Sequence, residues 1–159
     1  MSERRALLQA VLLTPLALAL RTASAEATDY ASAAEVFEAI DRLEADAAAR
    51  LRRLGRQSPA AHVFTASALA DHERHRRVRA RHRARLGLGA AAVATAAESE
   101  DTSLPGLRAA QEALVYAHAE GFPALGDALA VQALMANMVD LARHLTVIDL
   151  WLEREEARG

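Results

Sequence analysis

The same pair of residue types occurs twice in the chain at the same spacing. Asp71 precedes His75 by four residues, and Asp140 precedes His144 by four residues. On a helix, residues four apart project from one face about 6 Å apart. A carboxylate oxygen and an imidazole nitrogen at that separation can bind one transition-metal ion. One such pair arises easily by chance, but two pairs, each in the middle of an apolar helical stripe, predict a metal site.

Two glutamates are candidates to complete the ligand set. Glu44 interrupts an apolar stripe at helical spacing, so its carboxylate is predicted to point inward, where it needs a cation. The alternative is that Glu44 pairs with an arginine at the edge of the stripe. Glu112 is the second candidate, although Gln111 and His118 compete with it for the inward face, and Tyr116 follows it by one turn.

The composition favours an all-α chain, because alanine is abundant while glycine, proline and aromatic residues are sparse. Ser32 with Glu35, Ser58 and Asp127 are expected to cap helices, and Gly55 is expected to end the first one. Two short turns and a long connection over 88–103 then predict a four-helix bundle made of two antiparallel hairpins. The predicted helices span residues 33–54, 59–86, 105–125 and 127–156.

The predicted turns bring the candidate ligands to one level of the bundle. Residues equally far from the turn of a helical hairpin lie side by side, so each hairpin places one glutamate beside one Asp-His pair. Carboxylates and imidazoles suit iron, manganese or zinc, and the chain has no cysteine to bind softer metals. Six side chains are predicted to converge on one or two ions. They are Glu44, Asp71, His75, Glu112, Asp140 and His144.

Composition excludes several other classes of function. Without cysteine there are no disulfides, zinc ribbons or thiol nucleophiles, and without lysine there is no Schiff-base or P-loop chemistry. The formal net charge is −2. A run of seven arginines over residues 74–85 is predicted to be a solvated face that pairs with acids of the first and fourth helices. A nucleic-acid surface is disfavoured because no aromatic residues are interleaved.

Residues 1–25 are predicted to be a cleaved signal peptide. Arginines are followed by a short apolar run over 6–20, and small residues stand before the expected cleavage site. The alternatives are an uncleaved anchor and a structural first helix. The stretch from Glu3 to Gln9 resembles a twin-arginine export signal through Arg4 and Arg5, although its first and last residues depart from that pattern. The mature chain, 26–159, is then expected in the periplasm or otherwise outside the cytoplasm.

The organisation of residues 32–155 resembles the exported bacterial ferritin-like domains. That family places a Glu on helices one and three and a Glu-x-x-His on helices two and four, and these hold two iron or manganese ions. His72 and Leu141 stand where the family has the second pair of glutamates, and aspartates four residues before each histidine replace them. The stretches that resemble the family's four motifs are centred on Glu44, His75, Glu112 and His144.

The resemblance implies an extracytoplasmic metal-binding protein in which iron is favoured and manganese or zinc is an alternative. With iron, it implies oxidase or peroxide-reducing activity. The departures from the motif leave a di-iron centre, a mononuclear centre and a decayed site open. The alternative is an interaction or structural bundle without metal, in which the Asp-His pairs form a buried network. Metal ions are the expected partners, a homodimer is left open, and neither nucleic-acid binding nor stable membrane insertion after signal cleavage is expected.

Overall fold

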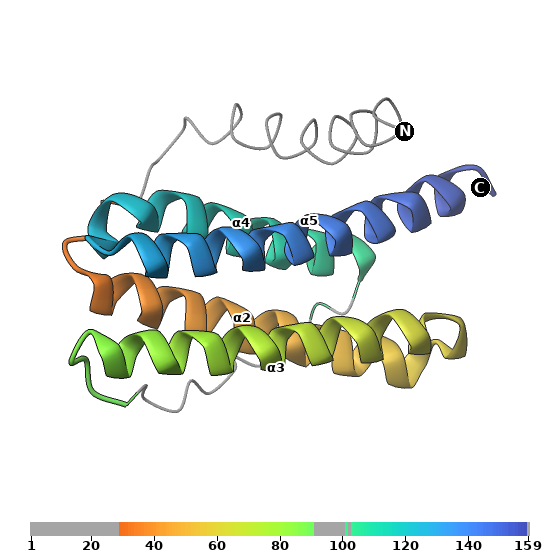
Figure 1. Cartoon of the computed structure of the whole chain (residues 1–159). Helices are drawn as coiled ribbons and strands as arrows, with labels where there is room; N and C mark the ends of the chain where they lie inside the picture. The colour runs from red at the N-terminus through yellow and green to blue at the C-terminus, as the bar shows by residue number, and fades with distance from the viewer. Residues whose placement is uncertain (1–28, 91–100, 102, 159) are drawn as a thin grey trace, which may run out of the picture.

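The computed structural model describes residues 29–90, 101 and 103–158, and this part of the chain contains four long helices and no strand (Figure 1). The all-α prediction is therefore confirmed for the described residues. The predicted signal peptide lies outside them, as does most of the connection before the third long helix. The elements are α2 (Ala33–Gln57), the 3-10 turn η1 (Pro59–Ala61), α3 (His62–Arg85), α4 (Leu104–Leu125) and α5 (Ala128–Glu156).

The four helices pack as a ring. α2 lies against α3 and α4, and α5 lies against the same two helices from the opposite corner. The chain reverses direction between α2 and α3 and again between α4 and α5, as the colours of Figure 1 show. Gly121 brings α4 close to α2, because a Cβ at this position would collide with the side chain of Val36. Among the described residues, no helix combines the length and apolar character that a membrane span requires.

Side-chain caps set the first residues of three helices, and the sequence predicts two of them, at Ser32 and Asp127. Ser32, Ser103 and Asp127 each accept a hydrogen bond from the backbone N–H three residues further on. Glu35 completes the cap of α2 by accepting from the backbone N–H of Ala31. Gly126 ends α4 in the left-handed conformation with φ of 61°, which glycine adopts without strain. Local chemistry therefore places these helix ends correctly.

The turn between α2 and α3 differs from the prediction. α2 continues past Gly55 to Gln57, and Ser58, which directly precedes η1, makes no side-chain cap bond. A Cβ on Gly55 would lie 2.5 Å from Oγ1 of Thr65 on α3. This glycine therefore allows close packing of two helices, and does not end one.

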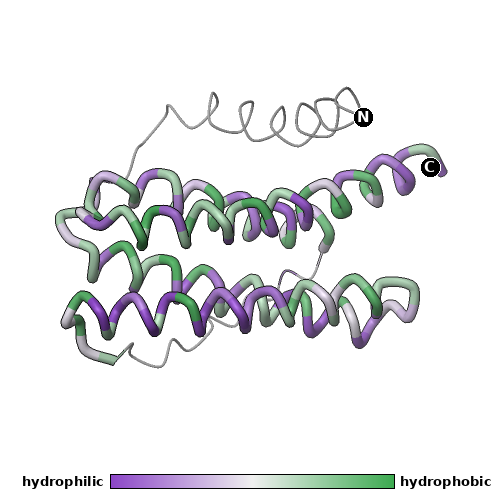
Figure 2. Tube along the Cα trace, viewed as in Figure 1, coloured by the Kyte–Doolittle hydropathy of each residue, from purple (hydrophilic) through white to green (hydrophobic). Residues whose placement is uncertain are grey.

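The helices do not share the apolar core equally. α2, α4 and α5 supply nearly all of it, whereas Ala68 is the one buried hydrophobic residue of α3. Hydrophilic residues recur along α3 in Figure 2. The prediction of a solvated arginine face is wrong for Arg79 and Arg83, which are buried, while the other five arginines of the run are exposed. The predicted pairing with the first and fourth helices is wrong for Arg76 and Arg77, whose ion pairs are with Glu73 of α3 itself. The other buried residues of α3 are Thr65, Asp71, His72 and His75.

Candidate metal centre

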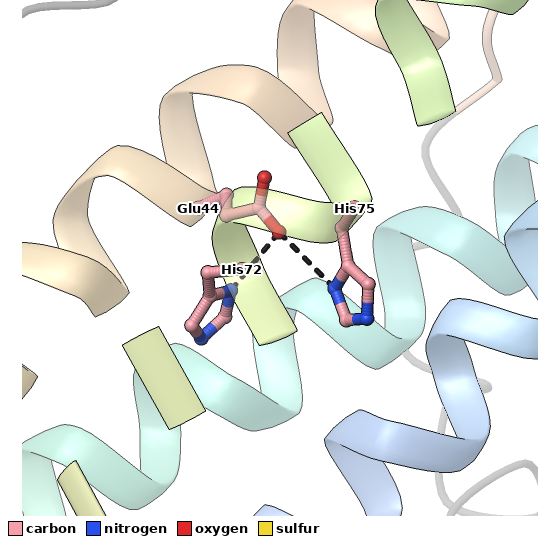
Figure 3. A group of neighbouring side chains, drawn as sticks. All are labelled: Glu44, His72 and His75. Atoms are coloured by element: carbon pink, nitrogen blue, oxygen red, sulfur yellow. Dashed lines mark hydrogen bonds and ion pairs between the residues drawn. The ribbon is translucent and has the colours of Figure 1, made fainter. Parts of the chain in front are cut away.

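A carboxylate and two imidazoles lie together in the middle of the bundle (Figure 3). Glu44 comes from α2, and His72 and His75 come from α3; all three are buried. Oε1 of Glu44 lies 2.9 Å from Nδ1 of His72 and 3.3 Å from Nδ1 of His75. One ligating atom from each residue lies within 4.8 Å of the other two. This group can hold a metal ion.

Helical spacing explains how the three side chains meet. Glu44 belongs to the buried stripe of α2 that includes Ile40 and Leu51, so the packing of that stripe turns the carboxylate inward. His72 and His75 are three residues apart and therefore project from one face of α3, which packs against α2. Two neighbouring turns of one helix thus face one residue of its partner.

The charge of Glu44 is stabilised from two sides. Arg79 on α3 forms an ion pair with Oε2 of Glu44, and its Nε donates to Asp41 at 2.8 Å. Burial by itself would raise the pKa of Glu44. The hydrogen bond from His72, the close approach of the His75 ring and the charge of Arg79 outweigh burial and hold this pKa well below its ordinary value. Glu44 is therefore ionised at neutral pH and able to bind a cation.

His75 lies between two carboxylates. Its Nε2 is 3.1 Å from Oδ2 of Asp140, while its Nδ1 faces Glu44. A neutral imidazole has only one N–H, so it can donate to one of them. If Nε2 donates to Asp140, Nδ1 turns a lone pair toward the Glu44 carboxylate unless a proton or a cation lies between them. In many metal sites a carboxylate accepts a hydrogen bond from one ring nitrogen of a histidine, and this bond orients the other ring nitrogen toward the metal ion. Asp140 can orient His75 in the same way.

Gln111 on α4 supports His72 from the other side. Its side chain is fully buried, and its Nε2 lies 3.0 Å from Nε2 of His72. In this orientation the amide donates to Nε2, so Nδ1 of His72 carries the proton and donates to Glu44. Oε1 of Gln111 bonds to no other described residue. Rotating the amide by half a turn would let Oε1 accept from Nε2–H and would free Nδ1 to bind a metal ion.

The two predicted Asp-His pairs are exchanged between helices. Asp71 of α3 accepts a hydrogen bond from His144 of α5 at 3.1 Å, and Asp140 of α5 accepts from His75 of α3 at the same distance. This crossed pairing requires α3 and α5 to run in opposite directions. The structure thus brings both aspartates and both histidines to mid-bundle, but each aspartate binds the histidine of the other helix.

Two half-exposed arginines cover the two aspartates on the outside of the bundle. Arg74 lies 2.6 Å from both Asp71 and Asp140. Arg143 lies 2.7 Å from Asp140 and 3.3 Å from Asp71. Burial raises the pKa of each aspartate, but the histidine and arginine partners outweigh it and lower the pKa below its ordinary value. Burial also lowers the pKa of His144 to about 4, so this imidazole is neutral at pH 7.

The structure does not bring Glu112 into this cluster. Glu112 is only partly buried, pairs with Arg108 at 2.9 Å and accepts a hydrogen bond from Tyr116 at 3.3 Å. The inward face of α4 is occupied by Gln111 and His118, the two competitors for that place. The neighbouring residue on a helix is rotated by about 100°, which is enough to turn Glu112 away from the centre.

Sequence reasoning missed His72 as a candidate ligand, although a signal for it was present. The His72-x-x-His75 spacing places two imidazoles on one helical face as well as a spacing of four does. The resulting set of two histidines and one carboxylate suits a first-row transition metal with open coordination positions. Comparison of the chain with known proteins gave no match to a protein-family model, to a curated protein or to a solved structure.

Proposed function

We propose that the protein binds one transition-metal ion through Glu44, His72 and His75. The observation that supports this most strongly is the convergence of three buried ligating atoms from two helices. Ligands bonded to one ion at about 2.0–2.2 Å stand about 3 Å apart or slightly more. The distances of 2.9 Å and 3.3 Å from the Glu44 oxygen to the two imidazole nitrogens match this requirement.

The local charge also favours a cation. Glu44 and Asp41 carry two negative charges around the site, and Arg79 supplies one positive charge. One negative charge is therefore in excess within a buried layer, where an uncompensated charge is costly. A divalent ion offsets this charge and fills the place between His75 and Glu44 where a proton or cation is needed.

The donor set favours iron, with manganese or zinc as alternatives. Two histidines and one carboxylate with open positions are typical of non-haem iron centres. A bound iron ion would supply redox chemistry toward dioxygen or peroxide. The chain's own part is to orient the ligands: Asp140 fixes the ring of His75, Gln111 fixes that of His72, and Arg79 holds Glu44.

We also propose that the four helices form a ferritin-like bundle and that the mature chain is exported. The ring packing of the helices and the long connection between α3 and α4 support the first proposal. The pattern of residues 1–25 supports the second. Replacing Arg4 and Arg5 with lysine should block export by the twin-arginine route, and N-terminal sequencing of the secreted protein should begin near Glu26. Recovery of Met1 on a cytoplasmic form would contradict export.

A second candidate function is that of a structural or interaction bundle with a decayed site. The crossed pairs of Asp71 with His144 and of Asp140 with His75, and the ion pair of Arg79 with Glu44, give every carboxylate of the cluster a partner without a metal ion. Buried polar networks of this kind specify one arrangement of a core. This function predicts that no ion binds tightly.

Metal binding to purified protein distinguishes the two functions. We expect elemental analysis and calorimetry to find one iron, manganese or zinc ion per chain in the parent and none in the double variant His72→Leu/His75→Leu. The control His62→Leu, an exposed histidine of the same helix, should bind as the parent does. The metal should raise the melting temperature of the parent and of the control only, because a ligand stabilises by mass action.

Two outcomes would contradict the proposed site. Equal binding by the parent and the double variant would place the metal elsewhere, and absence of binding by the parent would favour the structural bundle. The variant Asp71→Asn/His144→Gln tests the number of ions. It should keep one ion if Glu44, His72 and His75 suffice, and should lose affinity at least tenfold if the aspartate and histidine are ligands.

A further inference from the structure

Apart from His75, Gln111 and His144 in the cluster itself, three buried polar side chains from three different helices each retain an atom that bonds to no other described residue. These atoms are Nη1 of Arg79, Nε2 of His118 and Nδ2 of Asn137. The residues are 1%, 0% and 4% exposed and come from α3, α4 and α5. Buried polar groups almost always have a hydrogen-bond partner, so three such atoms require an explanation.

The contacts around the candidate metal site indicate that these three residues lie at about the same height along the axis of the bundle. Gln111 of α4 contacts His72 of α3, and the two helices run in the same direction. His118 and Arg79 each lie seven residues, about two turns, beyond these contacts and on the same faces. His75 of α3 pairs with Asp140 of α5, and these two helices are antiparallel. Three residues further along α3 and three residues back along α5, Asn137 therefore lies beside residue 78, one position from Arg79.

The free atoms of His118 and Arg79 are turned away from their existing partners. Nδ1 of His118 donates to the carbonyl oxygen of Leu114 on its own helix at 2.7 Å, so Nε2 on the opposite edge of the ring faces away from α4. Burial lowers the pKa of His118 to about 4, and Nε2 is therefore a lone pair at neutral pH. Arg79 uses Nε and Nη2 for Asp41 and Glu44, which leaves the hydrogens of Nη1.

We propose that Arg79, His118 and Asn137 bind one small molecule that carries an O–H group, which is water in the resting protein and hydrogen peroxide when peroxide is supplied. The N–H groups of Arg79 and Asn137 donate to an oxygen of this ligand, and the ligand's O–H donates to Nε2 of His118. Azide and halide ions have no hydrogen to donate and would leave His118 without a partner.

The site lies close to the candidate metal ligands, so a bound peroxide could take part in the chemistry of a metal ion. Arg79, one of the three residues, forms an ion pair with Glu44, so a molecule that Arg79 holds lies close to a candidate metal ligand. A peroxide bound at this place would be positioned for a metal ion held by the candidate ligands. This use of peroxide rests on the proposed metal-binding function, whereas the binding of water does not.

Histidine NMR on metal-free protein tests the site itself. We expect ¹⁵N-labelled histidine to show His118 with the proton on Nδ1, and water–protein cross-relaxation to detect one long-lived water near its ring. Asn137→Leu should lose this water while keeping His118 as the reporter, and His118→Phe should lose it as well. The control His62→Phe changes an exposed ring and should keep the signal.

Titration of zinc-loaded protein with hydrogen peroxide tests the ligand class, because zinc does not turn peroxide over. We expect a saturable shift of the His118 Nε2 resonance in the parent, a response at least tenfold weaker in Asn137→Leu, and no shift with sodium azide. Mass spectrometry of the same samples should show that Met138, the buried neighbour of Asn137, remains unoxidised.

The outcomes separate this inference from the proposed function. No long-lived water in the metal-free parent would overturn the site. A water that persists without any response to peroxide would mean a structural water only and would overturn the peroxide assignment. Failure of the metal proposal would appear instead as a lack of zinc binding, with the water signal of the metal-free protein unchanged.

Discussion

α2 and α3 lie side by side but bury opposite kinds of residue. The buried face of α2 is apolar except for Glu44, whereas that of α3 is polar except for Ala68. Burial of apolar surface drives folding, while each buried charge must be paired to avoid a large penalty. The comparison shows that stability comes mainly from the surfaces of α2, α4 and α5, and that α3 supplies the chemistry at the expense of stability.

The largest expected effect comes from leaving the buried carboxylates of α2 without their partner on α3. Arg79→Leu should lower the free energy of unfolding by about 3–5 kcal/mol, because Glu44 then remains buried without a countercharge. Glu44→Leu/Arg79→Leu should recover most of this loss and should abolish metal binding. Urea unfolding measures both effects, with Arg76→Leu, an exposed arginine of α3, as the control. Equal stability of the single and double variants would show that the packing of Arg79, and not its charge, matters.

Removing apolar surface from α2 should affect stability and leave the site intact. Ile40 is fully buried in the larger apolar cluster. Ile40→Ala should lower the free energy of unfolding by about 3 kcal/mol, because it removes buried methyl groups and leaves a cavity. Calorimetry on the folded protein should give unchanged metal affinity. A tenfold loss of affinity would mean that the apolar stripe also positions Glu44 and would contradict the division between the two helices.

The buried histidines should make the free energy of unfolding depend on pH, whereas the apolar core has no titratable group and should not. His118 has a folded pKa of about 4 against an ordinary value of 6.5. Because this pKa is depressed, the unfolded chain takes up the proton first, and stability that is complete above pH 6.5 is lost as pH falls toward 4. Protonation of His118 in the unfolded chain should lower the free energy of unfolding by about 2 kcal/mol between pH 6.5 and 5. Urea unfolding of His118→Phe should show a flatter pH profile, and an unchanged slope would contradict this.

The smallest effect concerns the close contact between the ends of α2 and α3. Gly55→Ala gains helix propensity of about 1 kcal/mol, but its Cβ would lie 2.5 Å from Oγ1 of Thr65. We expect a net loss of about 1 kcal/mol from the forced displacement of α3. Gly55→Ala/Thr65→Ala should reverse the loss, because the second change removes the colliding oxygen. Thermal unfolding of the single and double variants checks this, and a stabilised single variant would show that the helices can separate there without penalty.

Local patterns were sufficient to predict most helix ends and the inward direction of Glu44. Ser32 and Asp127 act through bonds to residues three positions away, so their effect is visible in the sequence. The α2–α3 register also follows from the short turn, which places Glu44 beside residues 72–75. Gly55 misled the prediction because its reason for being glycine is a contact with another helix.

The partners within the polar cluster depend on packing that the sequence does not contain. α3 and α5 are not consecutive, so no short turn sets their register, and the exchange of partners between the two Asp-His pairs could not be foreseen. Glu112 and Gln111 are adjacent, so a rotation of α4 by about 100° decides which of them faces the interior. The apolar residues of α4 do not form one clear stripe, so the sequence does not determine this rotation. His72 could have been found, since its spacing from His75 is local.

The crossed hydrogen bonds also bear on how the chain folds. A hairpin of α2 and α3 alone would expose Asp71 and His75 without the partners that α5 provides, and a hairpin of α4 and α5 alone would leave Asp140 and His144 in the same position. Neither half can complete its polar layer before the other docks. The two halves should therefore unfold together in a single cooperative transition, although each resembles an independent helical hairpin.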